Sequence, residues 1–224
     1  MINIYIRSVA RYTIMTLFLL AALSETAMTT PFISGSNLLP DRYDLMPEYS
    51  SNMISEIEVD TPDGWINYCM RNITECDNLE TKSQFIQLTV ESIENLNKIN
   101  TFVNSRIIAR SDMAHNNTSD YWDVPKDNYG DCEDYALMKR KLLIEAGFSK
   151  GALLMTMVKL ETGELHAVLT VITQHGDYIL DNLSESISPW FNKPFKYLKR
   201  QSKHNQNIWT SLNGAPVSSQ SSNS

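Results

Sequence analysis

One cysteine stands among acidic residues in the stretch GDCEDY, residues 130–135. Cys132 is flanked by Asp131, Glu133 and Asp134, and the apolar pattern after it places it in the first turn of a helix. Unpaired N–H groups and the positive end of the helix dipole favour a thiolate there. The three carboxylates oppose it, because they repel a negative sulfur. The stretch therefore predicts a reactive cysteine with a positive partner, or a cation that neutralises the carboxylates.

Histidine is the usual positive partner of a catalytic cysteine, because the ion pair activates the nucleophile and later protonates the leaving group. His166 opens an apolar strand. The other three histidines lie in polar loops or turns and are expected at the surface: His115, His175 and His204. Asp181 closes the following strand and is the candidate that orients the imidazole. The residues thus suggest a triad of Cys132, His166 and Asp181, with a structural thiol at a helix start as the alternative.

The pairing of the two strands decides whether His166 and Asp181 meet. A two-residue turn at His175-Gly176 sets Asp181 opposite Thr170, about 13 Å along the strand from His166. The triad therefore requires a turn centred near Thr173-Gln174, or a β-bulge. Because the offset is an even number of residues, both side chains share one face of the sheet.

Several other elements must position these residues. Apolar residues at helical spacing predict a long helix over about 81–109, opened by the capping-box pattern Thr81-Lys-Ser-Gln84. A second helix is predicted over 132–146, ending at Gly147. Alternating segments between turn residues predict three strands: 152–160, 164–173 and 177–182. Helices followed by a small antiparallel sheet indicate an α+β fold.

Thr61-Pro62 is predicted to start a shorter helix, with Pro62 at its first position. Its inward-facing residues are predicted to be Trp65, Ile66 and Cys69. Positions seven residues apart on an unbroken helix are separated by about 10 Å, too far for a disulfide. Cys69 and Cys76 are therefore either free buried thiols, or bonded across a helix that ends near Asn72.

The N-terminus is typical of a secretory signal peptide. Arg7 and Arg11 precede the apolar run 13–24, which is short for a membrane span, and Ala22-Leu-Ser24 offers a cleavage site; an uncleaved anchor is the alternative. Removing residues 1–24 takes away two positive charges and no acid, so the formal charge changes from −7 to −9. An acidic protein of this kind is a poor candidate for binding nucleic acid.

The composition, with 42% hydrophobic residues, is that of one globular domain. We expect a signal peptide over 1–24 and an irregular arm over 25–60. The domain itself is expected over 61–205. A polar segment follows, and we expect a disordered tail over 206–224.

The motif residues resemble the bacterial transglutaminase-like cysteine proteinases, the LapG-type periplasmic proteases. The resemblance covers roughly residues 60–195 and rests on these segments: Trp65, Cys69, Cys76, Ile99-Asn-Thr-Phe-Val-Asn104, Trp122-Asp-Val-Pro125, Gly130-Asp-Cys-Glu-Asp-Tyr135, Lys139, Leu142, Gly147, His166-Ala-Val-Leu169 and Ile179-Leu-Asp-Asn182. It implies a papain- or transglutaminase-like fold. It also implies that Cys132 is the nucleophile, His166 the general base and acid, and Asp181 the orienting carboxylate.

The resemblance further implies a bound Ca²⁺ beside the cysteine, with oxygen ligands from Asp131, Glu133 and Asp134. Such an ion would cancel the repulsion between these acids and the thiolate. Trp122 resembles a family tryptophan that lines a substrate groove or receptor surface, and ordinary core packing is its alternative role.

The function implied is a periplasmic, calcium-dependent cysteine endopeptidase. Its substrate would be a large cell-surface adhesin, cut near the N-terminus beside a pair of alanines to release cells from a biofilm. Its regulator would be an inner-membrane cyclic di-GMP receptor of the LapD type. Two alternatives remain: a transglutaminase-like acyltransferase that uses an amine acceptor, and a non-catalytic calcium-responsive binding module.

Overall fold

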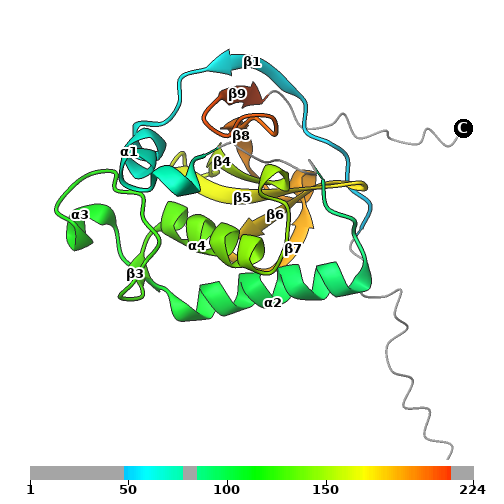
Figure 1. The fold of residues 1–224 in the computed structure, drawn as a ribbon, viewed down its shortest axis with the longest axis horizontal. Coiled ribbons are helices and arrows are strands. Elements are labelled where there is room, and N and C mark those ends of the chain that lie inside the picture. The colour runs from blue at the N-terminus through cyan, green and yellow to red at the C-terminus, as the bar shows by residue number, and fades with distance from the viewer. Residues whose placement is uncertain (1–47, 78–84, 213–224) are drawn as a thin grey trace, which may run out of the picture. The chain divides into compact units, whose positions relative to one another are not determined.

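The computed structural model describes residues 48–77 and 85–212 (Figure 1). The helices are α1 (Asp63–Arg71), α2 (Val90–Arg106), α3 (Asp112–His115) and α4 (Cys132–Glu145), with single 3₁₀ turns at η1 (Ile73–Glu75), η2 (Lys150–Ala152) and η3 (Trp190–Asn192). The strands are β1 (Ser55–Val59), β2 (Ile108–Ala109), β3 (Tyr129–Gly130), β4 (Leu153–Lys159), β5 (Leu165–Thr173), β6 (Gly176–Asp181), β7 (Ser184–Pro189), β8 (Lys196–Gln201) and β9 (Trp209–Leu212). No helix in these described ranges has the length and apolar character needed to cross a membrane.

Seven strands form one antiparallel sheet in the order β1-β9-β8-β4-β5-β6-β7. The three predicted strands are confirmed as β4, β5 and β6 within one or two residues, and the predicted α+β class is confirmed. The sheet is larger than predicted. Helix α4 packs on its central strands and α2 packs on α4 and β7, so both helices lie on one side of the sheet (Figure 1).

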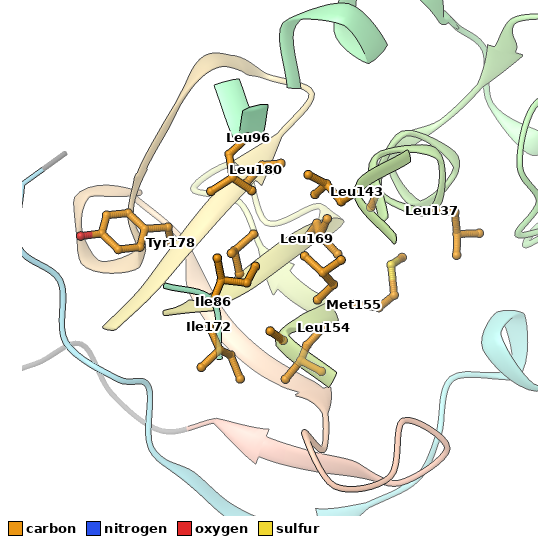
Figure 2. Packing of buried hydrophobic residues seen from close by; sticks show 14 of the residues in the cluster. Ile86, Leu96, Leu137, Leu143, Leu154, Met155, Leu169, Ile172, Tyr178 and Leu180 are labelled. Atoms are coloured by element: carbon orange, nitrogen blue, oxygen red, sulfur yellow. The ribbon is translucent and has the colours of Figure 1, made fainter. Parts of the chain in front are cut away.

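The sheet carries apolar residues on both faces because its strands alternate. Toward α2 and α4, residues such as Met155, Leu169 and Leu180 pack against Leu96, Leu137 and Leu143 of the helices (Figure 2). The opposite face forms a smaller cluster: Met53, Val158, Val168, Ile179, Trp190 and Leu212. Strand β5, which carries His166, is buried along its whole length after Leu165.

The predicted long helix over 81–109 is wrong at both ends. Thr89 and Ser92 cap each other reciprocally, and helix α2 begins at Val90. The capping-box pattern at 81–84 lies outside the described residues. Residues 85–89 are not helical, because Ile86 exchanges backbone hydrogen bonds with the end of β5. The helix ends at Arg106, where the chain turns into β2 and pairs with β3 in parallel.

The end of helix α1 determines whether Cys69 and Cys76 can form a disulfide. The helix ends at Arg71 with Asn72 as its C-cap, and the chain then turns back so that Cys69 and Cys76 are disulfide-bonded with their Cα atoms 5.4 Å apart. Pro62 is the N-cap of the helix and not its first residue as predicted, so α1 begins one residue later, at Asp63. The buried side of α1 is Gly64, Trp65 and Tyr68, whereas Ile66 is exposed, contrary to the prediction.

The predicted domain boundaries change at both ends. Residues 55–59, assigned to an irregular arm, form strand β1, and β9 continues the domain to Leu212. These two strands pair with each other and add to the β8 edge of the sheet. The predicted signal peptide over 1–24 and the last residues of the predicted tail lie outside the described residues.

A buried ion pair fastens the segment before β1 to the sheet. Arg200 Nη1 donates to Asp177 Oδ2 at 2.6 Å, Met53 N donates to the same oxygen, and Arg200 Nη2 donates to Met53 O. Replacing Arg200 by Met is expected to lower the free energy of unfolding by about 3–5 kcal/mol, because it leaves the Asp177 carboxylate buried without its cation. Urea denaturation measures the loss. Lys196→Met, on an exposed position of the same strand, is the control and should cost little.

Candidate active site

Cys132 is the first residue of α4, as predicted, and Asp131 is the N-cap. The β2–β3 pair holds the preceding chain, since Arg110 N donates to Gly130 O at 2.9 Å. A Cβ at Gly130 would lie 2.6 Å from Asp134 Oδ2, so this position requires glycine. Local sequence and the parallel strand pair together determine where the thiol lies.

The Cys132 thiol lies between β5 and an acid of its own helix. Ala167 N donates to Cys132 Sγ at 3.4 Å, which places the sulfur against β5 beside His166. The thiol donates to Glu133 Oε2 at 3.0 Å. Burial raises the pKa of the Cys132 thiol, and the charge and hydrogen bond of Glu133 raise it further. Neutralising the Glu133 carboxylate would therefore favour the thiolate.

His166 and Asp181 meet in the sheet. His166 Nε2 lies 2.9 Å from Asp181 Oδ1, and the two side chains are almost fully buried, at 5% and 1% exposure. The hairpin turn is Gln174-His175, because Thr173 pairs with Gly176 and Leu169 with Leu180. Continuing this register places Asp181 opposite Val168, two residues from His166.

Neither of the two predicted routes to this contact, a turn at Thr173-Gln174 or a bulge, is the observed one. The turn lies one residue later, and the remaining two-residue offset is spanned by the side chains. Diagonal neighbours on adjacent strands lie about 7–8 Å apart, within reach of a long side chain. His166 and Asp181 are such a diagonal pair.

Asp181 is held as a carboxylate by its surroundings. Although burial acts to raise its pKa, the hydrogen bond with His166, the Leu183 N–H and the charge of Lys193 together lower the pKa of Asp181 below its ordinary value. Leu183 N donates to Asp181 Oδ1 at 3.1 Å, and Lys193 Nζ lies 3.4 Å from Oδ2. A carboxylate only accepts, so His166 Nε2 carries the proton. Nδ1 is then the nitrogen available to the thiol.

Five carboxylates gather around the start of α4, in two groups that share Asp112. One consists of Asp112, Asp120 and Glu133, and the other of Asp112, Asp131 and Asp134; within each group one oxygen per residue lies within 4.8 Å of the others. Burial, followed by the charge of Asp131, raises the pKa of Glu133 to about 8. Asp131 Oδ1 is buried and has no hydrogen-bond partner among the described residues. Carboxylate oxygens crowded in this way suit a hard divalent cation.

The prediction of Asp131, Glu133 and Asp134 as ligands missed Asp112 and Asp120. These two acids follow serines in the polar stretch 110–131, and nothing in their sequence context separates them from other loop acids. Asp134, in contrast, accepts hydrogen bonds from Asp123 N at 2.8 Å and from Asp131 N at 3.3 Å. Both of its oxygens therefore also support the loop and the helix start.

Trp122 packs in the core. It is 2% exposed and makes edge contacts with Trp65 and Trp209. Its Nε1 donates to Asp120 Oδ1 at 2.8 Å, so the tryptophan fixes one of the clustered carboxylates. This burial agrees with the expected core role of Trp122. It does not agree with the other expectation, that Trp122 lines a substrate groove or a receptor surface.

Another histidine, His115, also has an aspartate partner. His115 Nε2 lies 2.8 Å from Asp127 Oδ2, but Asp127 is 55% exposed and no cysteine accompanies the pair. Among the chain's three cysteines, Cys132 alone is free. His115 and Asp127 therefore form a surface pair that can serve as a control for the buried one.

Lys139 of α4 is fully buried, and its Nζ has no hydrogen-bond partner among the described residues. Burial lowers the pKa of Lys139 to about 7, although Asp181 and Glu185 act to raise it and Lys193 acts with the burial. In the unfolded chain the pKa is about 10.4. Between these two values the unfolded chain binds more protons than the folded one.

This difference predicts that Lys139 makes the free energy of unfolding rise with pH from about 7 to about 10, by at most ~1.4 kcal/mol per pH unit. Lys139→Met should remove that contribution from the slope. Urea denaturation at pH 7, 8 and 9 measures it. Lys141→Met, on the same helix but partly exposed, is the control and should keep the wild-type slope; equal slopes for wild type and Lys139→Met would contradict the prediction.

Comparison with solved structures gives matches to LapG of Legionella pneumophila. The calcium-bound form is 25% identical with a TM-score of 0.46, over 55% of this chain and 72% of that chain. A second LapG structure is 27% identical with a TM-score of 0.45, over 52% and 67%. The EGTA-treated form is 25% identical with a TM-score of 0.45, over 55% and 71%. No curated protein matches the sequence.

The family comparison covers most of the described domain. The profile of the bacterial transglutaminase-like cysteine proteinases matches residues 56–216, a span that includes β1 and β9 as well as Cys132, His166 and Asp181. The chain belongs to the family of bacterial transglutaminase-like cysteine proteinases and has the mixed helix and antiparallel-sheet fold of these enzymes.

Proposed function

We propose that Cys132, His166 and Asp181 form the catalytic triad of a cysteine endopeptidase. The observation that carries the proposal is their convergence. The free thiol accepts a hydrogen bond from Ala167 N, the residue after His166 on β5, and His166 Nε2 lies 2.9 Å from Asp181 Oδ1. These two contacts support an arrangement of nucleophile, base and orienting carboxylate of the kind that thiol proteases use.

In the proposed reaction the Cys132 thiolate attacks the scissile carbonyl carbon. The C–N bond breaks and leaves an acyl thioester, while the His166 imidazolium gives its proton to the departing amine. His166 then takes a proton from water, which attacks the thioester and releases the carboxylic acid and the thiol. Asp181 stabilises the imidazolium and keeps the ring in one orientation.

We further propose that the clustered carboxylates bind Ca²⁺. The ion would be held by one of the two groups, either Asp112, Asp120 and Glu133 or Asp112, Asp131 and Asp134. When bound, calcium supplies positive charge that neutralises these acids. Glu133 would then no longer raise the pKa of the Cys132 thiol, and the His166 imidazole could take its proton. The buried, mutually repelling carboxylates support this proposal, and LapG of Legionella pneumophila is described in a calcium-bound form.

The proposed substrate is a large cell-surface adhesin, cut near its N-terminus beside a pair of alanines, so that cleavage releases cells from a biofilm. The proposed setting is the periplasm, reached through the N-terminal signal peptide. The proposed regulator is an inner-membrane cyclic di-GMP receptor of the LapD type. Membership of the bacterial cysteine proteinase family supports the reaction class, and the resemblance to LapG-type proteases motivates the substrate and regulator.

The test incubates the purified mature protein with N-terminal fragments of large adhesins from the same genome. The arms are excess calcium, excess chelator, Cys132→Ala in calcium, and His115→Ala in calcium as a matched histidine control. We expect cleavage in calcium and in the His115 variant, and none in the other two arms. Cleavage that persists in Cys132→Ala would overturn the thiol mechanism.

The same experiment separates the two alternatives. A fluorescent amine present in each arm would be joined to the adhesin fragment if the enzyme were an acyltransferase. Fragments that remain intact but bind the protein in calcium, equally for wild type and Cys132→Ala, would favour a binding module. Survival of cleavage in chelator would remove calcium from the mechanism and leave the acids with structural roles.

A further inference from the structure

Asp181 lies where the chain turns into β7, one of the two edge strands of the sheet. It is the last residue of β6 and pairs with Ser184, so a two-residue turn joins β6 to β7. Strand β7 is the edge of the sheet, whereas Cys132 and His166 lie on the central helix and strand. Hairpin turns at sheet edges open more readily than central strands. Keeping Asp181 in place therefore requires a support from outside the sheet.

Helix α2 provides such a support through three asparagines. Asn97, Asn100 and Asn104 are three and four residues apart and so share one face of the helix. Asn104 Nδ2 donates to Asp181 O at 3.1 Å and to Ser184 O at 3.0 Å. Asn100 Nδ2 donates to Ser184 O at 2.8 Å and to Glu185 O at 2.9 Å. Asn97 Oδ1 accepts from Ile187 N at 3.1 Å.

The direction of these hydrogen bonds determines how the side-chain amide of each asparagine is oriented. The partners of Asn100 and Asn104 are carbonyl oxygens, so both NH₂ groups must face the turn. Their Oδ1 atoms then point elsewhere, are buried, and have no hydrogen-bond partner among the described residues. An unpaired buried acceptor calls for a donor nearby.

Lys139 of α4 does not supply that donor, because its buried Nζ makes no hydrogen bond to either Oδ1 or to any other atom of the described residues.

We propose that Asn104, backed by Asn100, is a positioning residue for Asp181. The proposal rests on the proposed triad. Asn104 touches neither substrate nor reacting atoms; it holds the backbone from which the Asp181 carboxylate reaches His166. Because a misplacement of about 1 Å can cost on the order of 100-fold in rate, loss of this contact should affect the chemistry more than the fold.

The test compares Asn104→Ala with Asn97→Ala, which removes a similar helix-to-strand hydrogen bond farther along β7. In ¹⁵N-histidine-labelled protein with calcium, the His166 Nε2–H resonance, assigned by its loss in His166→Ala, reports the contact with Asp181. We expect Asn97→Ala to keep the wild-type resonance. In Asn104→Ala it should shift and exchange faster with water, as in Asp181→Ala.

A second readout needs no substrate. The rate of Cys132 alkylation by iodoacetamide at pH 7 should fall about 10- to 100-fold in Asn104→Ala and stay within about threefold in Asn97→Ala, at matched losses of thermal stability. Equal effects of the two asparagine variants would overturn the positioning role. If Asp181→Ala itself leaves both readouts at the wild-type level, the triad fails and the inference fails with it. If Asp181→Ala lowers them and Asn104→Ala does not, the inference alone fails.

Discussion

Asp181→Ala is expected to lower the rate of peptide cleavage by on the order of 10³- to 10⁴-fold while leaving the fold intact. Without the carboxylate, His166 loses the acceptor that fixes its tautomer and the negative charge that stabilises its imidazolium. The measurement is single-turnover cleavage of an adhesin fragment in calcium, with circular dichroism to verify folding.

Asp127→Ala is the matched control for this prediction. It removes the other histidine-bound aspartate, which lies 2.8 Å from His115 at the surface, and should keep nearly full activity. An Asp181→Ala enzyme that retained more than about a tenth of the wild-type rate would show that the buried contact between Asp181 and His166 is structural.

Asp112→Asn is expected to remove most of the stabilisation that calcium gives to the protein. Asp112 belongs to both carboxylate groups, so its loss weakens either arrangement of ligands. A ligand at about 1,000 times its Kd stabilises the folded state by about 4 kcal/mol. Thermal unfolding of wild type and variant, with calcium and with chelator, measures the effect.

The control is Asp127→Asn, an exposed acid in the same stretch of chain. It should keep the full calcium-dependent rise in the unfolding temperature. A wild-type protein whose unfolding temperature is the same in calcium and chelator would contradict a calcium site at the start of α4.

The sequence predicts those parts of the structure that local signals determine. Helix α4, the strands β4, β5 and β6, and the positions of Cys132 and His166 follow from periodicity, capping and turn residues. Strands β1 and β9 could not be predicted in this way, because each is short; β1 pairs with β9, and β9 pairs with β1 and β8. The start of α2 was misplaced because Ile86 pairs with the distant end of β5, a contact that has no local signal.

The same distinction applies within the site. The prediction of Cys132, His166 and Asp181 rests on residue types and on their positions at a helix start and on two strands. The diagonal contact between His166 and Asp181 could not be predicted in this way. Moving the turn by one residue changes which residue of β5 lies opposite Asp181 by two positions. Local sequence does not identify Asp112 and Asp120, because only the tertiary fold brings these residues, 20 and 12 positions before Cys132, to the start of α4.

The most direct test of the central claim is the rate at which iodoacetamide alkylates Cys132, followed by mass spectrometry in calcium and in chelator. The disulfide leaves Cys132 as the free thiol, so the readout reports one residue and needs no substrate. We expect rapid alkylation of the wild type in calcium, and rates at least about tenfold lower both in chelator and in His166→Ala. Equal rates in all three conditions would mean that neither His166 nor a bound cation activates the thiol, and would contradict the proposed mechanism.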